Sequence, residues 1–206
     1  MKTDLKQQIK TYTARHGVFS IVRVPPLNYL VIDGQGDPNT SPRYKDALAA
    51  IYPIAYKVKF LSKTDLGHDY VVMPLEALWW SADMRSFTSD RDKSRWEWTL
   101  MIMVPDWITQ EHVAAGRRAA ARTGGGQALD DVRLERYDED LSVQTLHIGS
   151  YDDEAAVLDT MHHQFIPEHS LRVTGRHHEI YLSDARRTPA DRLRTILRQP
   201  VEVSTP

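Results

Sequence analysis

The sequence predicts an α+β protein with an antiparallel sheet, helices on one face of the sheet and a groove on the other. Three observations predict this class. Short apolar and aromatic runs typical of strands alternate with segments of helical periodicity. The order strand, loop, helix, strand occurs twice, at roughly 28–80 and 142–183. Each copy ends in a strand with one glutamate among apolar and aromatic residues, Glu76 in the first and Glu179 in the second.

The elements follow from these periodicities and from turn residues. Ser41 is a plausible helix cap with Pro42 at the first helical position, Pro53 either kinks the next helix or restarts it, and Gly124–Gly126 ends the alanine-rich helix. In chain order we predict a lead-in (1–16), strands (18–24, 28–34), a loop (34–42), a helix (43–62), a strand (69–80), a loop (81–94), a strand (95–104), a helix (108–122), strands (131–137, 142–149), a helix (152–166), a strand (176–183) and a short helix from Pro189 to about 198.

The amino-acid composition excludes some classes of function. The chain has 206 residues, 41% of them apolar and 26% charged, which is ordinary for a globular protein with a core. A net charge of −2 does not favour a polyanion surface, so we expect no direct nucleic-acid contact. The lack of cysteine excludes disulfides, thiolate catalysis and zinc fingers, and it fits a cytoplasmic protein.

We also expect neither a targeting segment nor a membrane anchor. The first eight residues are polar where a signal peptide needs an apolar run. No stretch reaches the about 18 consecutive apolar residues of a membrane span.

The strand at 176–183 is the most informative segment. Side chains alternate along a strand, so His177, Glu179 and Tyr181 share one face, and the opposite face, with His178 and Ile180, is predicted to be core. A carboxylate in an apolar site costs several kcal/mol unless it is paired. Such a group binds a cation between aromatic walls or acts as a general base on water.

A simpler alternative is that each glutamate is solvated on an exposed sheet face or is paired with an arginine such as Arg172 or Arg176.

All five tryptophans lie between positions 79 and 107, and Trp96 and Trp98 point the same way on one strand. Indoles form planar walls for flat ligands, although they also fill cores. We expect Trp80 and Trp98 to share a face with Glu76. The strands then line one aromatic cleft with a glutamate from each half of the molecule.

Other motifs give weaker evidence of function. The adjacent histidine pairs point apart, so we expect no metal site, and no cofactor motif is present. The glycine run follows a helix and is no phosphate loop, and a solvated face explains the basic residues Arg117, Arg118 and Arg122. In the turn 149–154 the acidic residues are expected to complement a helix N-terminus, and Tyr151 either reaches the cleft or is structural.

Six segments together resemble the GyrI-like small-molecule-binding family, and most closely its stand-alone, tryptophan-rich subgroup. They span nearly the whole chain, and the combination is specific although each piece alone is not. The segments are YPIAYKVK (52–59), PLEALWW (74–80), WEWTLMI (96–102), LHIGSYDDE (146–154), HHEIYLSD (177–184) and TILRQPV (195–201). One residue departs from the pattern, because Ala185 stands where the family turn has proline.

The resemblance implies one domain over 1–206, built of two pseudo-twofold-related strand-helix-strand-strand modules, about 17–104 and 105–206, around a central ligand cleft. The family's cleft takes hydrophobic, planar or cationic compounds, consistent with multidrug binding, and Glu179 matches the glutamate at its centre. Many relatives carry a helix-turn-helix region, for which the segment before the first strand is too short. The oligomeric state, monomer or homodimer, stays open.

Some stand-alone relatives hydrolyse the cyclopropane ring of DNA-alkylating natural products, which is a detoxification. For this chain the resemblance then implies catalytic Glu179 and Tyr181, with Glu179 activating water and Tyr181 or Tyr151 assisting at the carbonyl. The ligand-binding residues would be Glu76, Trp80, Trp96, Trp98, Tyr151 and His177. Three functions stay open: a binder that senses or sequesters toxins, a hydrolase acting in the same cleft, and a protein-interaction module that inhibits a partner such as DNA gyrase.

Overall fold

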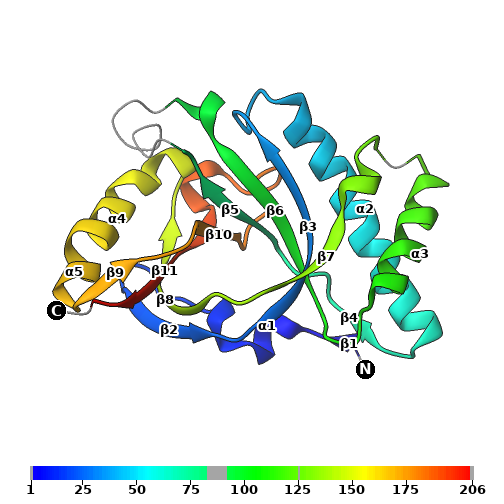
Figure 1. Ribbon diagram of the computed structural model, residues 1–206, viewed down its shortest axis with the longest axis horizontal. Helices are drawn as coiled ribbons and strands as arrows, with labels where there is room; N and C mark the ends of the chain where they lie inside the picture. The colour runs from blue at the N-terminus through cyan, green and yellow to red at the C-terminus, as the bar shows by residue number, and fades with distance from the viewer. Residues whose placement is uncertain (1, 83–91, 125, 205–206) are drawn as a thin grey trace. The chain divides into compact units, whose positions relative to one another are not determined.

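The computed structural model describes residues 2–82, 92–124 and 126–204, so most of the predicted loop 81–94 lies outside the described residues. The chain divides into two compact units (Figure 1). Unit 1 comprises Met1–Gln8 and Leu27–Tyr137, and unit 2 comprises Ile9–Pro26 and Asp138–Pro206. Each unit combines an antiparallel sheet with helices, which confirms the predicted α+β class.

Unit 1 is built on a four-stranded antiparallel sheet. Its strands follow the spatial order β5-β6-β3-β7. Their bounds are β3 (Leu27–Gln35), β5 (Leu75–Trp80), β6 (Glu97–Val104) and β7 (Arg133–Tyr137). A separate parallel pair joins β1 (Lys2–Thr3) to β4 (Asp69–Tyr70), and the short helix α1 (Leu5–Gln8) lies between these two strands in the sequence.

The long helix α2 (Pro42–Asp65) packs against the sheet of unit 1. It begins as predicted: the Ser41 hydroxyl oxygen accepts a hydrogen bond from the Tyr44 backbone N–H, which satisfies one of the free donors of the first turn. Pro53 lies inside one continuous helix. The buried stripe consists of apolar residues at helical spacing: Ala47, Ala50, Ile51, Ile54, Ala55 and Val58.

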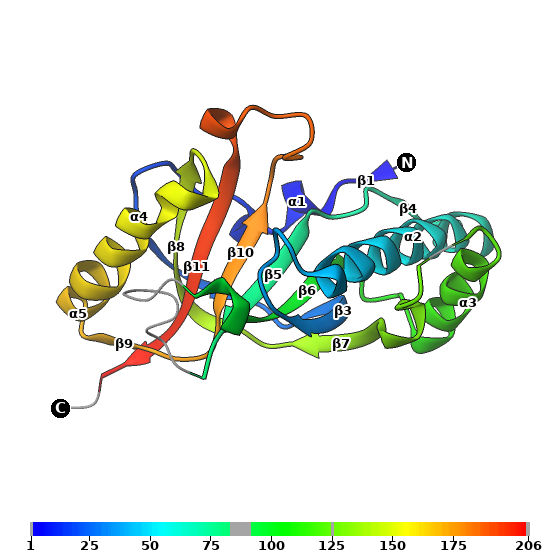
Figure 2. The same cartoon turned by 90° about the horizontal axis from the view of Figure 1, so that it is seen from above.

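The alanine-rich helix α3 (Gln110–Ala121) packs against α2 (Figure 2). Gly116 makes the close approach possible, because a Cβ at this position would collide with the side chain of Val58. The N-terminus of α3 is closed by His112, whose Nδ1 accepts a hydrogen bond from the backbone N–H of Thr109 at 3.1 Å. A 3-10 turn (Leu129–Asp131) then leads to β7.

Unit 2 contains a second antiparallel sheet, in the order β2-β8-β11-β10. Its strands are β2 (Ser20–Val24), β8 (Asp140–Ile148), β10 (His177–Tyr181) and β11 (Arg194–Val203), and the short strand β9 (Leu171–Val173) pairs with the end of β11. A 3-10 turn (Lys10–Tyr12) precedes β2.

The predicted helix at 152–166 is present in three parts, α4 (Glu154–Thr160), one π-helical turn (Met161–Phe165) and α5 (Ile166–Glu168). Met161 and Ile166 pack with Val143 of β8 and Leu197 of β11 in the core of unit 2. Figure 2 shows these helices alongside β8 and β11. The helix therefore covers the sheet face to which Val143 and Leu197 belong.

The predicted helix from Pro189 to about 198 is wrong. Only a short 3-10 turn (Ala190–Arg192) follows Pro189, and the chain then becomes β11, which pairs with β8 on one side and with β10 on the other. Proline is usually excluded from an inner strand. Pro200 is accommodated because the paired residues of β11 stop at Arg198 on the β10 side and resume at Val201 with β9, so Pro200 lies between the two partner strands.

The two units also differ in extent from the predicted halves of about 17–104 and 105–206. The strand β2 pairs with β8 and so belongs to unit 2, whereas α3 and β7 belong to unit 1. Both units share one topology. Unit 1 contains the series β3-α2-β5-β6, whose strands lie in the spatial order β5-β6-β3. Unit 2 contains the series β8-α4-β10-β11, whose strands lie in the equivalent order β10-β11-β8. That one domain arises from two similar halves stays a prediction.

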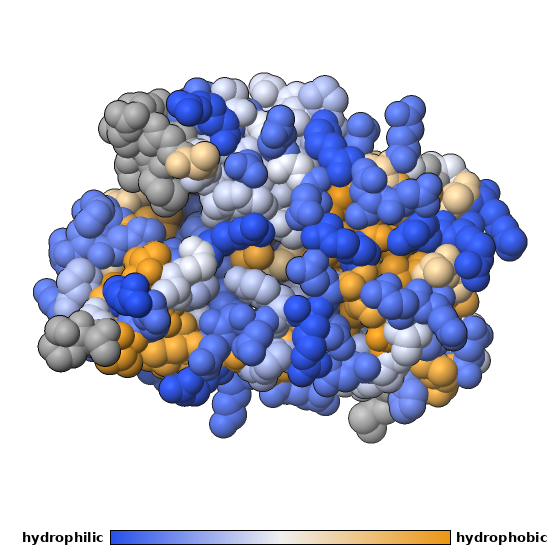
Figure 3. Space-filling model, in the orientation of Figure 1, coloured by the Kyte–Doolittle hydropathy of each residue, from blue (hydrophilic) through white to orange (hydrophobic). Residues whose placement is uncertain are grey.

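Many apolar side chains are buried, and some large ones are exposed. Figure 3 shows apolar atoms gathered where β9 and the end of β11 lie. The exposed residues there are Val173 and Val203.

A charged network is buried on the other face of the unit 2 sheet. Arg198 Nη1 donates to Glu139 Oε2 at 2.8 Å, and Nδ1 of His178 lies 2.9 Å from Oε1 of the same carboxylate. Arg198 also donates to Gln144 Oε1 and to the Thr11 carbonyl. Burial opposes ionisation of Glu139, but the charges and hydrogen bonds of His178 and Arg198 outweigh it and hold its pKa at about 2.

We expect Glu139→Gln to lower the free energy of unfolding by about 3–5 kcal/mol, because it leaves Arg198 buried without its counter-charge. The pKa of Glu139 is depressed on folding, so its contribution is complete above pH 4.5 and is lost as the pH falls toward 2. Denaturant unfolding at pH 7 and at pH 3 checks both points. Glu202→Gln, on the same strand as Arg198, breaks the exposed pair with Arg172 and should cost no more than about 1 kcal/mol. Equal effects of the two variants would contradict the prediction.

Candidate functional site

Strand β10 carries the candidate site. As predicted, its side chains alternate: His178 and Ile180 are fully buried, while His177, Glu179 and Tyr181 on the other face are partly exposed. Cross-strand pairing places Glu179 opposite Leu197 and Tyr181 opposite Thr195. The Glu179 face is therefore the one that the α4 helix covers.

Glu179 is held by its neighbours on the same strand. The Tyr181 hydroxyl donates a hydrogen bond to Glu179 Oε2 at 2.7 Å, and His177 Nε2 lies 3.5 Å from Oε1. The side chains of His177 and Glu179 are each only 14% exposed. The arginine alternative does not hold for Arg172, which pairs with Glu202 at 2.7 Å.

Tyr151 joins this group from a different element. It opens the 3-10 turn Tyr151–Asp153 that leads into α4, and its ring meets that of Tyr181 edge to face, with centroids 5.6 Å apart. Tyr151 is 42% exposed, so the group reaches the solvent at this point. Four predicted site residues thus lie together, and we call them the Glu179 cluster: Tyr151, His177, Glu179 and Tyr181.

Glu154, the first residue of α4, was missed as a site residue. The sequence interpretation placed it among the acids that complement a helix N-terminus, but only Asp152 and Asp153 are exposed there, whereas Glu154 is 4% exposed. Burial raises its pKa, and the neighbouring Glu179 and Asp152 raise it further against the effect of Thr195, to about 10. Glu154 is therefore uncharged at neutral pH. Its spacing from Leu158 and Met161, on the apolar side of the helix, was the available signal.

Several buried polar atoms on this face have no hydrogen-bond partner within the part of the chain that the structure describes. They are Oε1 of Glu154, Oγ1 of Thr145 and Nδ1 of His177. Burial, together with the nearby His177, lowers the pKa of His162 to about 4, so this imidazole is neutral at pH 7. Buried polar atoms of this kind are suited to pairing with ordered water or with a polar group of a ligand.

The tryptophans and Glu76 lie in unit 1. Glu76 of β5 is fully buried and shares its strand face with Trp80. Trp98 does not share that face, because it pairs with Trp79, whose side chain points the other way. The ring of Trp98 is fully buried against Gly34 and Tyr44, and its N–H donates to the Gly36 carbonyl at 3.2 Å. The prediction that Trp98 faces the same way as Glu76 is therefore wrong, and Trp98 is a core residue.

Trp96 remains partly exposed at the start of the tryptophan strand. Its ring meets Trp79 edge to face at 5.7 Å, and the ammonium of Lys93 lies 5.6 Å from its centroid. That Glu76, Trp80 and Trp96 join the Glu179 cluster in one cleft stays a prediction.

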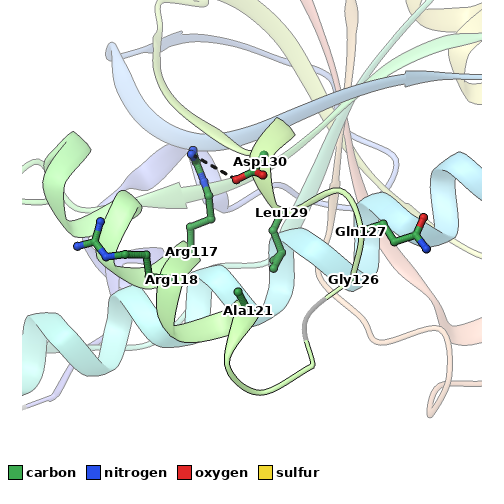
Figure 4. Close-up of a pocket in the computed structure, with 7 residues that line it drawn as sticks. All are labelled: Arg117, Arg118, Ala121, Gly126, Gln127, Leu129 and Asp130. Carbon is green, nitrogen blue, oxygen red and sulfur yellow. Dashed lines mark ion pairs between the residues drawn. The ribbon is translucent and has the colours of Figure 1, made fainter.

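A hollow on the surface of unit 1 is lined by none of the predicted site residues (Figure 4). One of its arginines is paired: Arg117 Nη1 lies 4.0 Å from Asp130 Oδ1, and Arg117 Nη2 donates to the Val132 carbonyl at 2.6 Å. We assign no function to it. In the described ranges we find no cluster of three potential metal-binding side chains and no helix with the length and apolar character of a membrane span.

The raised pKa of Glu154 gives a stability prediction. Between pH 4.5 and about 10 the folded chain retains a proton that the unfolded chain releases, so stability falls as the pH rises through this window. The slope is at most about 1.4 kcal/mol per pH unit. Denaturant unfolding between pH 6 and pH 9 should show this decline, and Glu154→Gln should flatten it. An unchanged slope in the variant would contradict a buried neutral Glu154.

The sequence model of the GyrI-like small molecule binding domain matches residues 18–202. Two crystal structures from Listeria innocua are similar over 98% of this chain and 100% of theirs, each at 34% identity. One is of an uncharacterized conserved protein, with a TM-score of 0.89, and the other is of a hydrolase, with a TM-score of 0.84.

A third structure, the EcmrR C-terminal domain, is 12% identical with a TM-score of 0.57, over 90% of this chain and 98% of that domain, and it shows the fold alone. None of the curated proteins compared with the chain matches it. The chain belongs to the GyrI-like small-molecule-binding domain family.

Proposed function

We propose that the protein binds hydrophobic, planar or cationic small molecules at the Glu179 cluster and hydrolyses cyclopropane-bearing electrophiles there, which detoxifies them. The observation that carries this proposal is the carboxylate of Glu179, 14% exposed and held by the Tyr181 hydroxyl at 2.7 Å. Similarity to a Listeria innocua protein described as a hydrolase, at 34% identity over nearly the whole chain, supports it.

The proposed reaction adds water across a strained carbon–carbon bond. Glu179 takes a proton from water as the water oxygen bonds to the cyclopropane methylene carbon. The bond from that carbon to the ring system breaks, and its electron pair moves through the conjugated system to the carbonyl oxygen, which then takes a proton. The hydroxyl of Tyr181 or Tyr151 stabilises the charge at that oxygen. The product contains the substrate and one water.

The cluster also suits binding without turnover. Tyr151 and Tyr181 offer two aromatic rings beside a carboxylate, a combination that attracts cationic and planar compounds. An enclosed carboxylate has no use in a module that only inhibits a protein partner, so we favour a small-molecule ligand.

Incubation with a duocarmycin-type cyclopropane compound should yield the ring-opened hydrate, measured by chromatography and mass spectrometry. Glu179→Gln should retain binding and lower kcat by about 100- to 10,000-fold, because the variant removes only the general base. Glu168→Gln, an exposed glutamate on α5, is the matched control and should turn over normally. Product formation no faster than in buffer would exclude this hydrolase function.

Binding is tested separately by titrating tryptophan fluorescence with planar cationic dyes. We expect quenching that Trp96→Phe reduces, since Trp96 is partly exposed and is one of the predicted ligand-binding residues. The control is Trp107→Phe, because Trp107 is also partly exposed, donates its indole N–H to Ser62 and is not a predicted ligand-binding residue, so this variant should quench like the wild type. No quenching by any dye tested would contradict the binding function.

A further inference from the structure

Glu154 is a second carboxyl group beside the Glu179 cluster, and the proposed reaction leaves it unused. It lies three residues after Tyr151, at the junction of the 3-10 turn and α4, so the segment that brings Tyr151 to Tyr181 also carries Glu154. Its residue is 4% exposed, and Oε1 has no hydrogen-bond partner among the described residues.

Three groups determine the protonation of Glu154. After burial itself, the largest influence is the carboxylate of Glu179 on β10, and Asp152 in the preceding turn acts in the same direction. Thr195, opposite Tyr181 on β11, favours ionisation but does not offset the other two. The charge of one carboxylate in a buried site opposes ionisation of a second carboxyl group, so Glu154 keeps its proton while Glu179 is ionised.

A purely structural role does not account for this arrangement. An acid that complements a helix N-terminus acts through its negative charge and is usually exposed, and Asp152 and Asp153 in the same turn are exposed whereas Glu154 is not. A buried carboxyl oxygen without a partner lowers stability by about 1–3 kcal/mol. A buried carboxyl group of this kind, near a second carboxyl group, is typical of an acid–base site. In such a site the different environments of the two groups push their pKa values apart, so one acts as the acid and the other as the base.

We propose that Glu154 is the proton donor of the site, giving its proton to the carbonyl oxygen of the bound electrophile while Glu179 takes a proton from the attacking water. This inference rests on the proposed function and supplies the proton that the reaction requires. The O–H bond of Glu154 breaks, a new O–H bond forms on the substrate oxygen, and the ring becomes a phenol. Return of the proton from Glu179 through water restores both groups. The substrate class is therefore an uncharged cyclopropane compound with a conjugated carbonyl group.

The first measurement needs no substrate. Infrared spectra of the wild type and Glu154→Gln at pH 7 should differ by the carbonyl band of one protonated carboxylic acid, which shifts in heavy water. Glu168→Gln, in which an exposed glutamate is replaced, should not remove this band. Absence of the band from the wild type overturns the inference, whatever the enzyme does.

The second measurement is the pH profile of ring opening with the duocarmycin-type probe. We expect wild-type kcat to fall as the pH approaches 10, and Glu154→Gln to lower kcat at least 100-fold and to lack this alkaline fall. Glu154→Asp keeps a proton to donate and should recover part of the rate. Circular dichroism and probe affinity show that each variant is folded and still binds.

The outcomes distinguish a failure of the inference about Glu154 from a failure of the proposed hydrolase function. If Glu154→Gln opens the ring as fast as the wild type, with the same pH profile, the inference fails and the hydrolase function stands. If the wild type gives no ring-opened product, both fail. A slow variant whose alkaline fall persists is also contrary, because Glu154 then affects the site without donating the proton.

Discussion

The ion pair between Arg198 and Glu139, with His178 bonded to the same carboxylate, fixes the strand on which the candidate site is built. Arg198 and His178 face each other across β11 and β10, so this network sets the register of the pair. Strand side chains alternate, and a slip of one residue would turn Glu179 to the opposite face. The buried charges on one face thereby keep the carboxylate on the other face under α4, where it meets Tyr181 and Tyr151.

The two units use one topology but orient their glutamates differently. Glu76 on β5 and Glu179 on β10 lie on topologically equivalent strands. Glu179 faces the helix of its unit, since it pairs with Leu197, which packs against α4 residues. Glu76 faces away from α2, because the α2 side of its sheet is occupied by Trp79 and Trp98, which pack around Tyr44. Similarity of chain order therefore does not make the two glutamates equivalent in chemistry.

Features that depend on residues close together in the sequence were predicted correctly. The period-two pattern of β10 and the cap at Ser41 were confirmed, and the tyrosine, histidine and glutamate side chains predicted on one face of β10 lie together. The strand β11 was missed because Pro189 resembles a helix start, whereas pairing with both β8 and β10 decides its structure. Glu139 and Arg198 were missed because their partners lie 39 to 59 residues apart along the chain. The sheet face that Trp98 occupies depends on the register of β6 against β5, and the alternation of side chains within one strand does not give that register.

Glu154 shows how a carboxyl group takes a different role when its environment changes. Asp152 and Asp153 are exposed, whereas the next residue, Glu154, is 4% exposed, and burial and the carboxylate of Glu179 raise its pKa. A cationic ligand would stabilise the ionised form of Glu154 and so release its proton, whereas an uncharged electrophile uses that proton. Binding of cations and hydrolysis of neutral compounds thus make opposite demands on one group. Under the proposed function, a single site would serve both because Glu179 would provide the negative charge and Glu154 would take the protonation state that suits the ligand.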